Sequence, residues 1–584
     1  MSSEGQKLED RVEELSTRVL SLETQLEKLK TRLSDFIDLE EKTTEGRDGT
    51  VSEDALSWAG RASILPRIAT ICFLLVVALV LRTITDVNVV PRLTGQWLGM
   101  GYAAAIMVAG WFLYGGKSPL APVFAACGAI LLGTVVVETR MHFQSLMIAP
   151  AYLTLLATGI LMALMSLRFN AFIPISVGVI VMCVAGAALD WPKPNFAYLS
   201  MLLFTANLLG FFAAKLKRCT WLRWSVMAVT MLMLLVGGTM MGLASVGGSE
   251  QPSGVSLFWY LAVITGFFVT FLVLSLIGIL RRQTEKHSRF ALSLPPINAA
   301  WAFVAALLVL SAEKSDLVGL GILGIVIALA HLVAAFVFAR RGAADSPVTS
   351  TFALAGTLLL GLSLPFASGS YTLTLPLLSL VALLLFQKSR DWNNGGIRAI
   401  SYTAQSYTVG GLFLFYMIGG FSPGDAILML PTFLLALLLV LEYALARRNP
   451  VPVESKLFES VDPKDRGVVL LLLAGLVSAF LMIRTGMGQV FPKDLNAFSC
   501  SQSVFINATA IVLIALAWLR HNREIRGVAI LVTVVGGFKV FLDMVGGGNG
   551  LPLVFSVLSF GILAAVESIV LGRWAKDNSG KAGK

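Results

Sequence analysis

Two pairs of charged residues stand in long apolar runs at the spacing of one helix face. Lys539 and Asp543 are four residues apart, and so are Arg82 and Asp86. Residues at i and i+4 meet on an α-helix, and ionisable groups inside a membrane are costly enough to indicate function. Both pairs are therefore candidates for a polar site that opens outward. The alternative is that Lys539 extends to the membrane interface and Asp543 caps the following turn.

Four further polar residues fall within or at the end of apolar runs. His331 lies near the middle of its run, where an imidazole could relay protons near neutral pH; the alternative is a neutral ring bonded to a neighbouring helix. Asn207 and Asn507 are interpreted as residues that make interhelical hydrogen bonds. Glu442 precedes the arginine pair 447–448, and we interpret the three as an ion cluster at the membrane interface.

Motifs for cofactor or metal chemistry are missing from the sequence. It contains no GxxxxGK[ST] loop for a nucleotide and no HExxH zinc motif. The four histidines lie far apart, and the five cysteines show no CxxC spacing. We therefore predict no cofactor, no metal site and no catalytic residue, and the interpretation leans away from an enzyme.

The elements that must position these residues are membrane-spanning helices. Of 584 residues, 56% are hydrophobic and 14% charged, with a mean hydropathy of +0.79, whereas soluble domains carry about 25% charged residues. Runs of about 20 apolar residues without strict alternation favour helices over a barrel. We predict an all-α polytopic membrane protein of about eighteen transmembrane helices arranged as hairpins, over residues 64–81, 93–114, 120–137, 147–166, 171–188, 196–214, 224–244, 257–280, 292–312, 317–339, 348–367, 371–387, 398–419, 424–446, 467–483, 498–519, 526–545 and 552–571.

Charge in the connecting loops predicts the orientation of the chain. If residue 1 is cytoplasmic and the spans alternate, the cytoplasmic loops and C-terminus carry 27 Lys and Arg, and the outer loops carry 7. This asymmetry follows the positive-inside rule and places both termini in the cytoplasm of an inner membrane. The basic residues form no stripe, so the pI of about 9.4 does not indicate nucleic-acid binding.

A short acidic head precedes the apolar body. Residues 1–63 carry a net charge of −6, from 9 Lys and Arg against 15 Asp and Glu. Apolar residues recur in alternating steps of four and three over residues 8–36, which is the heptad pattern of a coiled coil. The pattern predicts a homo-oligomer or a partner helix; the alternative is a helix lying on the membrane surface. The predicted domains are a coiled-coil helix (1–45), a linker (46–63), a transmembrane domain (64–571) and a cytoplasmic tail (572–584).

The two ends of the body carry distinctive sequences. They are KVFLD at 539–543, a glycine-containing turn and VLSFGIL at 557–563, and a first helix with Arg67-Ile68, Leu81-Arg82 and Asp86 after a coiled-coil head. With these sequences the chain resembles the domain-of-unknown-function 2339 family of multi-pass bacterial membrane proteins. Where the family often carries Arg before VLSF, this chain has Ser556. The resemblance implies a multi-pass architecture, a bilayer location and no established activity.

Three functions are compatible with these features. A transporter- or channel-like protein with an outward-facing polar site is favoured by the number of spans and by Pro and Gly within them. A membrane scaffold or envelope-maintenance protein that oligomerises or recruits a partner through its coiled coil is the alternative. An enzyme acting on lipid-linked glycans ranks last, because the predicted outer loops are short.

Overall fold

The computed structural model describes residues 64–87, 89–189, 191, 195–213, 220–246, 256–280, 289–312, 317–418, 426–449, 462 and 465–582. Within these ranges the chain forms eighteen α-helices and no β-strand, which confirms the all-α polytopic fold. Each predicted span coincides with one helix. Of the helices in the described part of the chain, sixteen are long and apolar enough to cross a membrane; α7 is shorter, and α15 carries more polar residues.

The structure divides into two compact units, and the first is built around three helices. This unit comprises the described residues up to 147 and residues 157–181. Its helices pack closely: a Cβ at Gly128 would lie 2.6 Å from the backbone nitrogen of Met107. Tyr102 also donates a hydrogen bond of 3.2 Å to the carbonyl of Leu74. The helices are α3 (Ile64–Asp86), α4 (Arg92–Gly115) and α5 (Ala121–Met141), while α6 (Ile148–Phe169) and α7 (Phe172–Ala188) contribute residues to both units.

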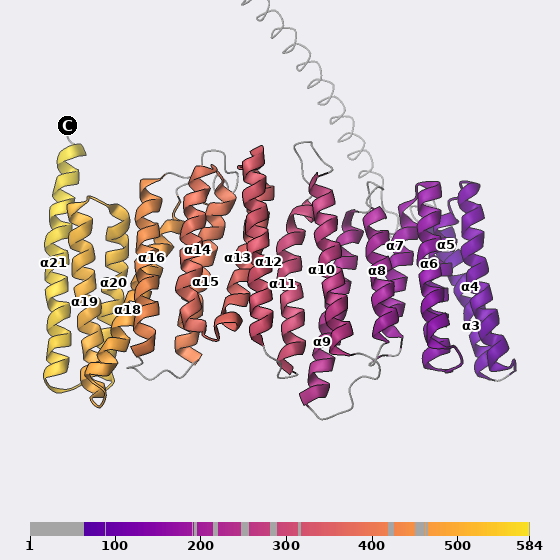
Figure 1. Ribbon diagram of the computed structural model, residues 1–584, viewed down its shortest axis with the longest axis horizontal. Coiled ribbons are helices and arrows are strands. Elements are labelled where there is room, and N and C mark those ends of the chain that lie inside the picture. Colours follow the sequence, from indigo (N-terminus) through magenta and orange to yellow (C-terminus); the bar gives the residue numbers. More distant parts are fainter. Residues whose placement is uncertain are drawn as a thin grey trace, which may run out of the picture. The chain divides into compact units, whose positions relative to one another are not determined.

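The second unit contains the remaining helices, which Figure 1 draws in magenta to yellow. Sequence neighbours such as α10 and α11, α14 and α15, and α19 and α20 pack as antiparallel pairs. The helices are α8 (Phe196–Ala213), α9 (Thr220–Val246), α10 (Leu257–Leu280), α11 (Arg289–Ala312), α12 (Leu317–Phe338), α13 (Pro347–Ser368), α14 (Tyr371–Asp391), α15 (Gly395–Ile418), α16 (Met429–Arg448), α18 (Gly467–Val490), α19 (Leu495–Leu519), α20 (Arg523–Val545) and α21 (Gly550–Ala582).

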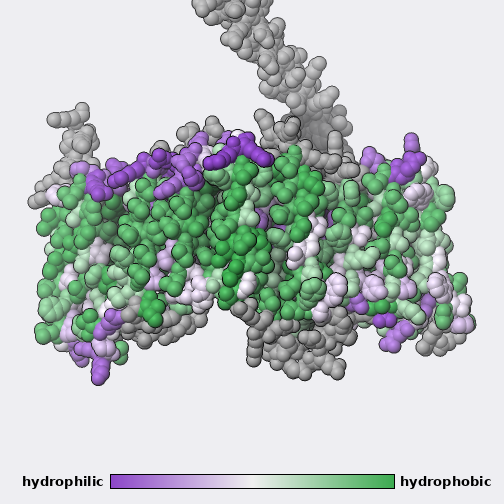
Figure 2. Space-filling view, viewed as in Figure 1, coloured by the Kyte–Doolittle hydropathy of each residue, from purple (hydrophilic) through white to green (hydrophobic). Residues whose placement is uncertain are grey.

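Apolar side chains cover the outside of these helices as well as their contacts. Within the second unit, Figure 2 shows an apolar band, with a row of hydrophilic residues along one end of the helices and a smaller hydrophilic group at the other. Basic residues occupy the last turns of α14 and α16. Large side chains such as Phe258, Leu323 and Phe538 are more than half exposed. A helix that is apolar on all faces is suited to lipid on one side and to protein on the other.

The predicted coiled coil of residues 8–36 and the linker at 46–63 lie outside the described residues. The predicted cytoplasmic tail, residues 572–584, overlaps α21, whose helical backbone continues to Ala582.

Candidate functional site

The pair Lys539 and Asp543 forms an ion pair near the end of α20. Lys539 Nζ donates to Asp543 Oδ1. The side chain of Asp543 is only 2% exposed and that of Lys539 is 23% exposed. The side chain of Asp543 faces the neighbouring helices. It therefore does not cap the following turn, which was the alternative interpretation.

Three serines from α19 and α21 complete the coordination of this carboxylate. Ser499 Oγ donates to Asp543 Oδ1 over 2.7 Å, and Ser503 Oγ donates to Oδ2. Ser556, on α21, lies 3.4 Å from Oδ2. Lys539 Nζ also reaches Ser499 Oγ at 2.8 Å. Both carboxylate oxygens are therefore occupied, and the cluster joins three helices as a closed polar contact.

The α19–α21 contact continues along the helices through amide side chains. Asn507 Nδ2 donates to Ser559 Oγ over 2.8 Å, and in the same unit Asn207 Nδ2 donates to Thr230 Oγ1 over 2.7 Å. Both asparagines thus make the interhelical hydrogen bonds that the sequence predicts. Such bonds stabilise membrane helix pairs by about 0.6–2 kcal/mol.

Arg82 forms an ion pair with a residue that the sequence reading missed. Its Nη2 lies 2.8 Å from Glu138 Oε1 on α5, with 56% and 25% of the two side chains exposed. Asp86 ends α3, but its side chain lies outside the described part of the chain. The predicted pairing of Arg82 with Asp86 therefore stays a prediction, and the contact with Glu138 arises from the packing of α3 against α5.

A pocket with both polar and apolar lining residues adjoins this ion pair in the first unit. Its cavity holds about 50 Å³ and is lined by side chains of α3, α4 and α5, including Arg82, Glu138, Gln96 and Tyr102. Gln96 is 6% exposed. Its Oε1 accepts a hydrogen bond from Ser145, but its Nε2 has no hydrogen-bond partner. A buried amide N–H without an acceptor is costly, so this pocket can accommodate a ligand oxygen.

Two larger pockets in the second unit are lined mainly by apolar side chains. One, of about 140 Å³, lies between α13, α14 and α15, and another, of about 720 Å³, lies between α11 and α13. Leucines, isoleucines and alanines form most of their walls, so these pockets offer surface to acyl chains and few partners to a polar solute.

His331 is buried within α12 and takes no part in the other polar clusters. Its Nδ1 lies 2.8 Å from the carbonyl of Ile327, one turn earlier on the same helix. Because a carbonyl only accepts, Nδ1 carries the hydrogen and Nε2 the lone pair. Nε2 has no hydrogen-bond partner, and the ring packs near Phe268 and Phe352. Neither the predicted bond to a neighbouring helix nor a relay partner is found among the described side chains.

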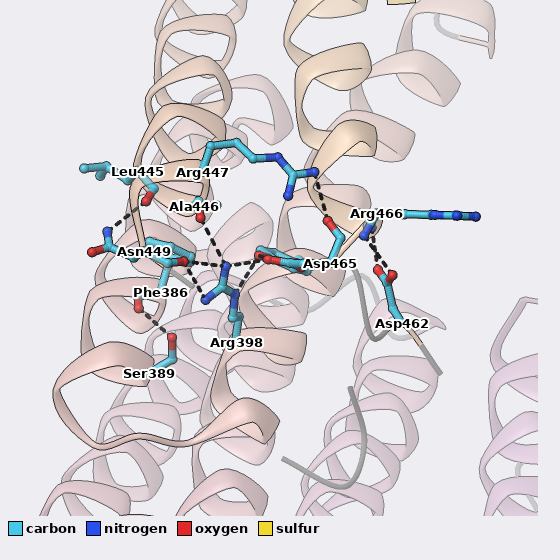
Figure 3. Close-up of polar contacts among 12 residues, drawn as sticks. Phe386, Ser389, Arg398, Leu445, Ala446, Arg447, Asn449, Asp462, Asp465 and Arg466 are labelled. Atoms are coloured by element: carbon cyan, nitrogen blue, oxygen red, sulfur yellow. Dashed lines mark hydrogen bonds and ion pairs between the residues drawn. The ribbon is translucent and has the colours of Figure 1, made fainter. Parts of the chain in front are cut away.

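Among the ion pairs of the described residues, the most deeply buried one was not predicted from the sequence (Figure 3). Arg398 lies at the start of α15, and its side chain is 2% exposed. Its Nη2 atom lies 2.5 Å from Asp465 Oδ2. The guanidinium also donates to the carbonyls of Ala446 and Asn449 at the end of α16 and to the hydroxyl of Tyr402. It sits 5.1 Å from the ring centroid of Phe386.

This arginine holds four segments together. A cation at the carbonyl end of α16 is favoured by the helix dipole, and a planar guanidinium can serve several acceptors at once. Burial raises the pKa of the Asp465 carboxyl, and the Arg398 guanidinium opposes this shift. Arg398 therefore connects α14, α15, α16 and the segment before α18 as a structural contact.

Glu442 is fully buried, so its prediction as part of an interfacial ion cluster is wrong. Ser401 Oγ lies 2.5 Å from its Oε1, and Gln405 Nε2 donates to its Oε2 over 2.6 Å. Arg447 instead pairs with Glu524 at 2.8 Å. A signal was present in the sequence: Arg398, Ser401 and Gln405 recur at steps of three and four, which places a polar stripe on one face of α15.

The described side chains contain no group of three His, Cys, Asp or Glu that could hold a metal ion. No protein-family model, curated protein or solved structure gives a significant match to the chain.

Proposed function

We propose that this protein is a transporter- or channel-like membrane protein whose polar binding site is the pocket between α3, α4 and α5. The observation that carries the proposal is the unpartnered amide of Gln96 beside the Arg82–Glu138 ion pair. Under the orientation that the loop charges predict, this pocket faces outward. Membership of the domain-of-unknown-function 2339 family is proposed with it and adds no activity.

Osmotic swelling of vesicles tests this function. The full-length protein is reconstituted into liposomes, which are then placed in concentrated solutions of small polar solutes, and light scattering reports their entry. We expect at least one solute to enter faster than in protein-free vesicles, and Gln96→Leu to slow its entry. Gln387→Leu is the matched control, because Gln387 is exposed on α14.

Equal solute entry with and without protein, for every solute, would contradict transport and leave the scaffold as the better function. A specific observation favours that second candidate. The Lys539–Asp543 cluster is closed by three serines, so the last three helices form a cross-linked anchor. In that case we propose that the heptad segment recruits a partner or a second copy, and that the helices hold it at the membrane.

A further inference from the structure

We propose that the α3–α5 pocket binds a small zwitterion that carries an oxyanion at one end and an ammonium at the other. This inference rests on the proposed function, because it assigns a ligand class to the same pocket. Two sources offer this chemistry: a free amino-acid-like solute and the ethanolamine phosphate headgroup of a lipid.

The oxyanion is assigned to the side of the pocket formed by Gln96. The side chain of Gln96 is 6% exposed, and its Oε1 is engaged by Ser145, so Nε2 is the end left without a partner. An amide nitrogen donates and never accepts. The missing partner is therefore an acceptor, and a carboxylate or phosphate oxygen is the strongest acceptor available to it.

The charges of the pocket select a ligand with both signs. Arg82 and Glu138 contribute one positive and one negative charge, 2.8 Å apart. A simple anion would be attracted by Arg82 and repelled by Glu138. A simple cation would be attracted by Glu138 and repelled by Arg82. A zwitterion can place its oxyanion toward Arg82 and Gln96 and its ammonium toward Glu138. The apolar wall at Leu131 and Val135 lowers the local dielectric and strengthens this selection.

The size of the cavity limits the ligand. Its volume is about 50 Å³. Since one water molecule needs roughly 10–15 Å³ of cavity volume, the space holds roughly three to five non-hydrogen atoms. Glycine, with a carboxylate and an ammonium on one carbon, matches this size, so the free solute is the source that the volume favours.

Calorimetric titration of the full-length protein in detergent tests the proposal with four probes: glycine, acetate, methylammonium and phosphoethanolamine. We expect glycine to bind and acetate and methylammonium to bind at least about tenfold more weakly, which is the effect of one lost hydrogen bond to a charged group. Tighter binding of phosphoethanolamine than of glycine would support the zwitterion and assign its source to lipid. Equal binding of acetate and glycine, or no binding of either zwitterion, would overturn the proposal.

Substitutions at Gln96 link the binding to the pocket. Gln96→Leu and Gln96→Met are each expected to weaken glycine binding at least about tenfold. Gln387→Leu should leave it unchanged. Each variant is first checked for the thermal stability of the unmodified protein, and Gln96→Met keeps nearly the original side-chain volume in case Gln96→Leu fails to fold. Unchanged binding in a stable Gln96 variant would overturn the assignment of the site.

The two proposals fail separately. Glycine binding without solute entry into vesicles would refute transport and leave the zwitterion site intact. Solute entry without zwitterion binding would refute the site and leave transport intact.

Discussion

Lys539 shows how a charged side chain is accommodated among helices that are apolar on most faces. It stands one turn before Asp543, and Ser499 bridges both residues. The carboxylate receives hydrogen bonds from two neighbouring helices, so the pair is held by its surroundings as well as by its own attraction. A buried pair of this kind is sensitive to the loss of one member, because the other is left uncompensated.

Lys539→Met and Asp543→Leu should each destabilise the protein by about 3–5 kcal/mol. The double variant should lose less than the sum of the two, because it leaves no orphaned charge. Thermal denaturation in detergent measures all three. The control is Lys388→Met, since Lys388 and Asp391 form a pair with nearly half of each side chain exposed; it should cost under about 1 kcal/mol. Small and additive effects at Lys539 and Asp543 would show that the cluster does not act as a unit.

Arg398→Lys should destabilise the protein by about 3 kcal/mol, although the charge is kept. A lysine ammonium cannot bind Asp465, Tyr402 and the end of α16 at once, because all of its N–H donors are on one nitrogen atom. The exposed Arg390, which makes one hydrogen bond of 3.3 Å to Asn449 Oδ1, gives the control Arg390→Lys with little expected change. The unfolding midpoint in detergent checks both. Equal effects at the two positions would mean that charge alone matters at Arg398.

Glycines allow a close helix contact in the second unit, between α12 and α13. Gly321 lies on α12 against the backbone of α13, where an added Cβ would come within 2.3 Å of the nitrogen of Ala367. On α13, a Cβ added at Gly356 would lie 2.7 Å from the Leu332 side chain and 2.8 Å from the carbonyl oxygen of Ala328. Small residues at membrane helix contacts let backbones approach and gain dispersion energy. The packing of α12 against α13 therefore depends on glycines, which have no side chain, as much as on apolar side chains.

Gly321→Ala should destabilise the protein by about 1–3 kcal/mol, because the methyl group meets backbone that cannot move aside easily. Gly319→Ala, two residues earlier on α12, has nothing within 4 Å of the added methyl group. It should be neutral or stabilising by up to about 1 kcal/mol through helix propensity. Thermal denaturation in detergent compares the two. A loss at Gly319 as large as that at Gly321 would contradict close packing as the cause.

At the scale of the whole molecule, we predict an even number of spans, which places both ends on the same side of the membrane. We expect a reporter enzyme that is active only outside the cytoplasm to be silent when fused at the C-terminus. The same reporter inserted in the 545–551 turn should be active, because one helix, α21, separates the two positions. Activity at the C-terminus and silence at the turn would reverse the topology and place the α3–α5 pocket on the cytoplasmic side.

The sequence by itself determined the class of fold and the helix positions. Membrane-spanning runs are continuous and apolar because lipid forces every backbone group into local hydrogen bonds. Each span can therefore be recognised from its own sequence, without knowing which helices pack against it. The same local logic identified the Lys539–Asp543 pair, whose members share one helix face, and the bonding role of Asn207 and Asn507.

Only the tertiary structure decided which helices surround each polar group. Glu138 and Gln96 stand 56 and 14 residues from Arg82 in the sequence, and no periodicity links them to it. Glu442 lies near the end of an apolar run, close to two arginines, and this position predicts an interfacial residue. In the structure, Ser401 and Gln405 of α15 form hydrogen bonds with it inside the fold. A polar residue in a membrane is satisfied through space by side chains of other helices, and sequence spacing within one helix does not contain that information.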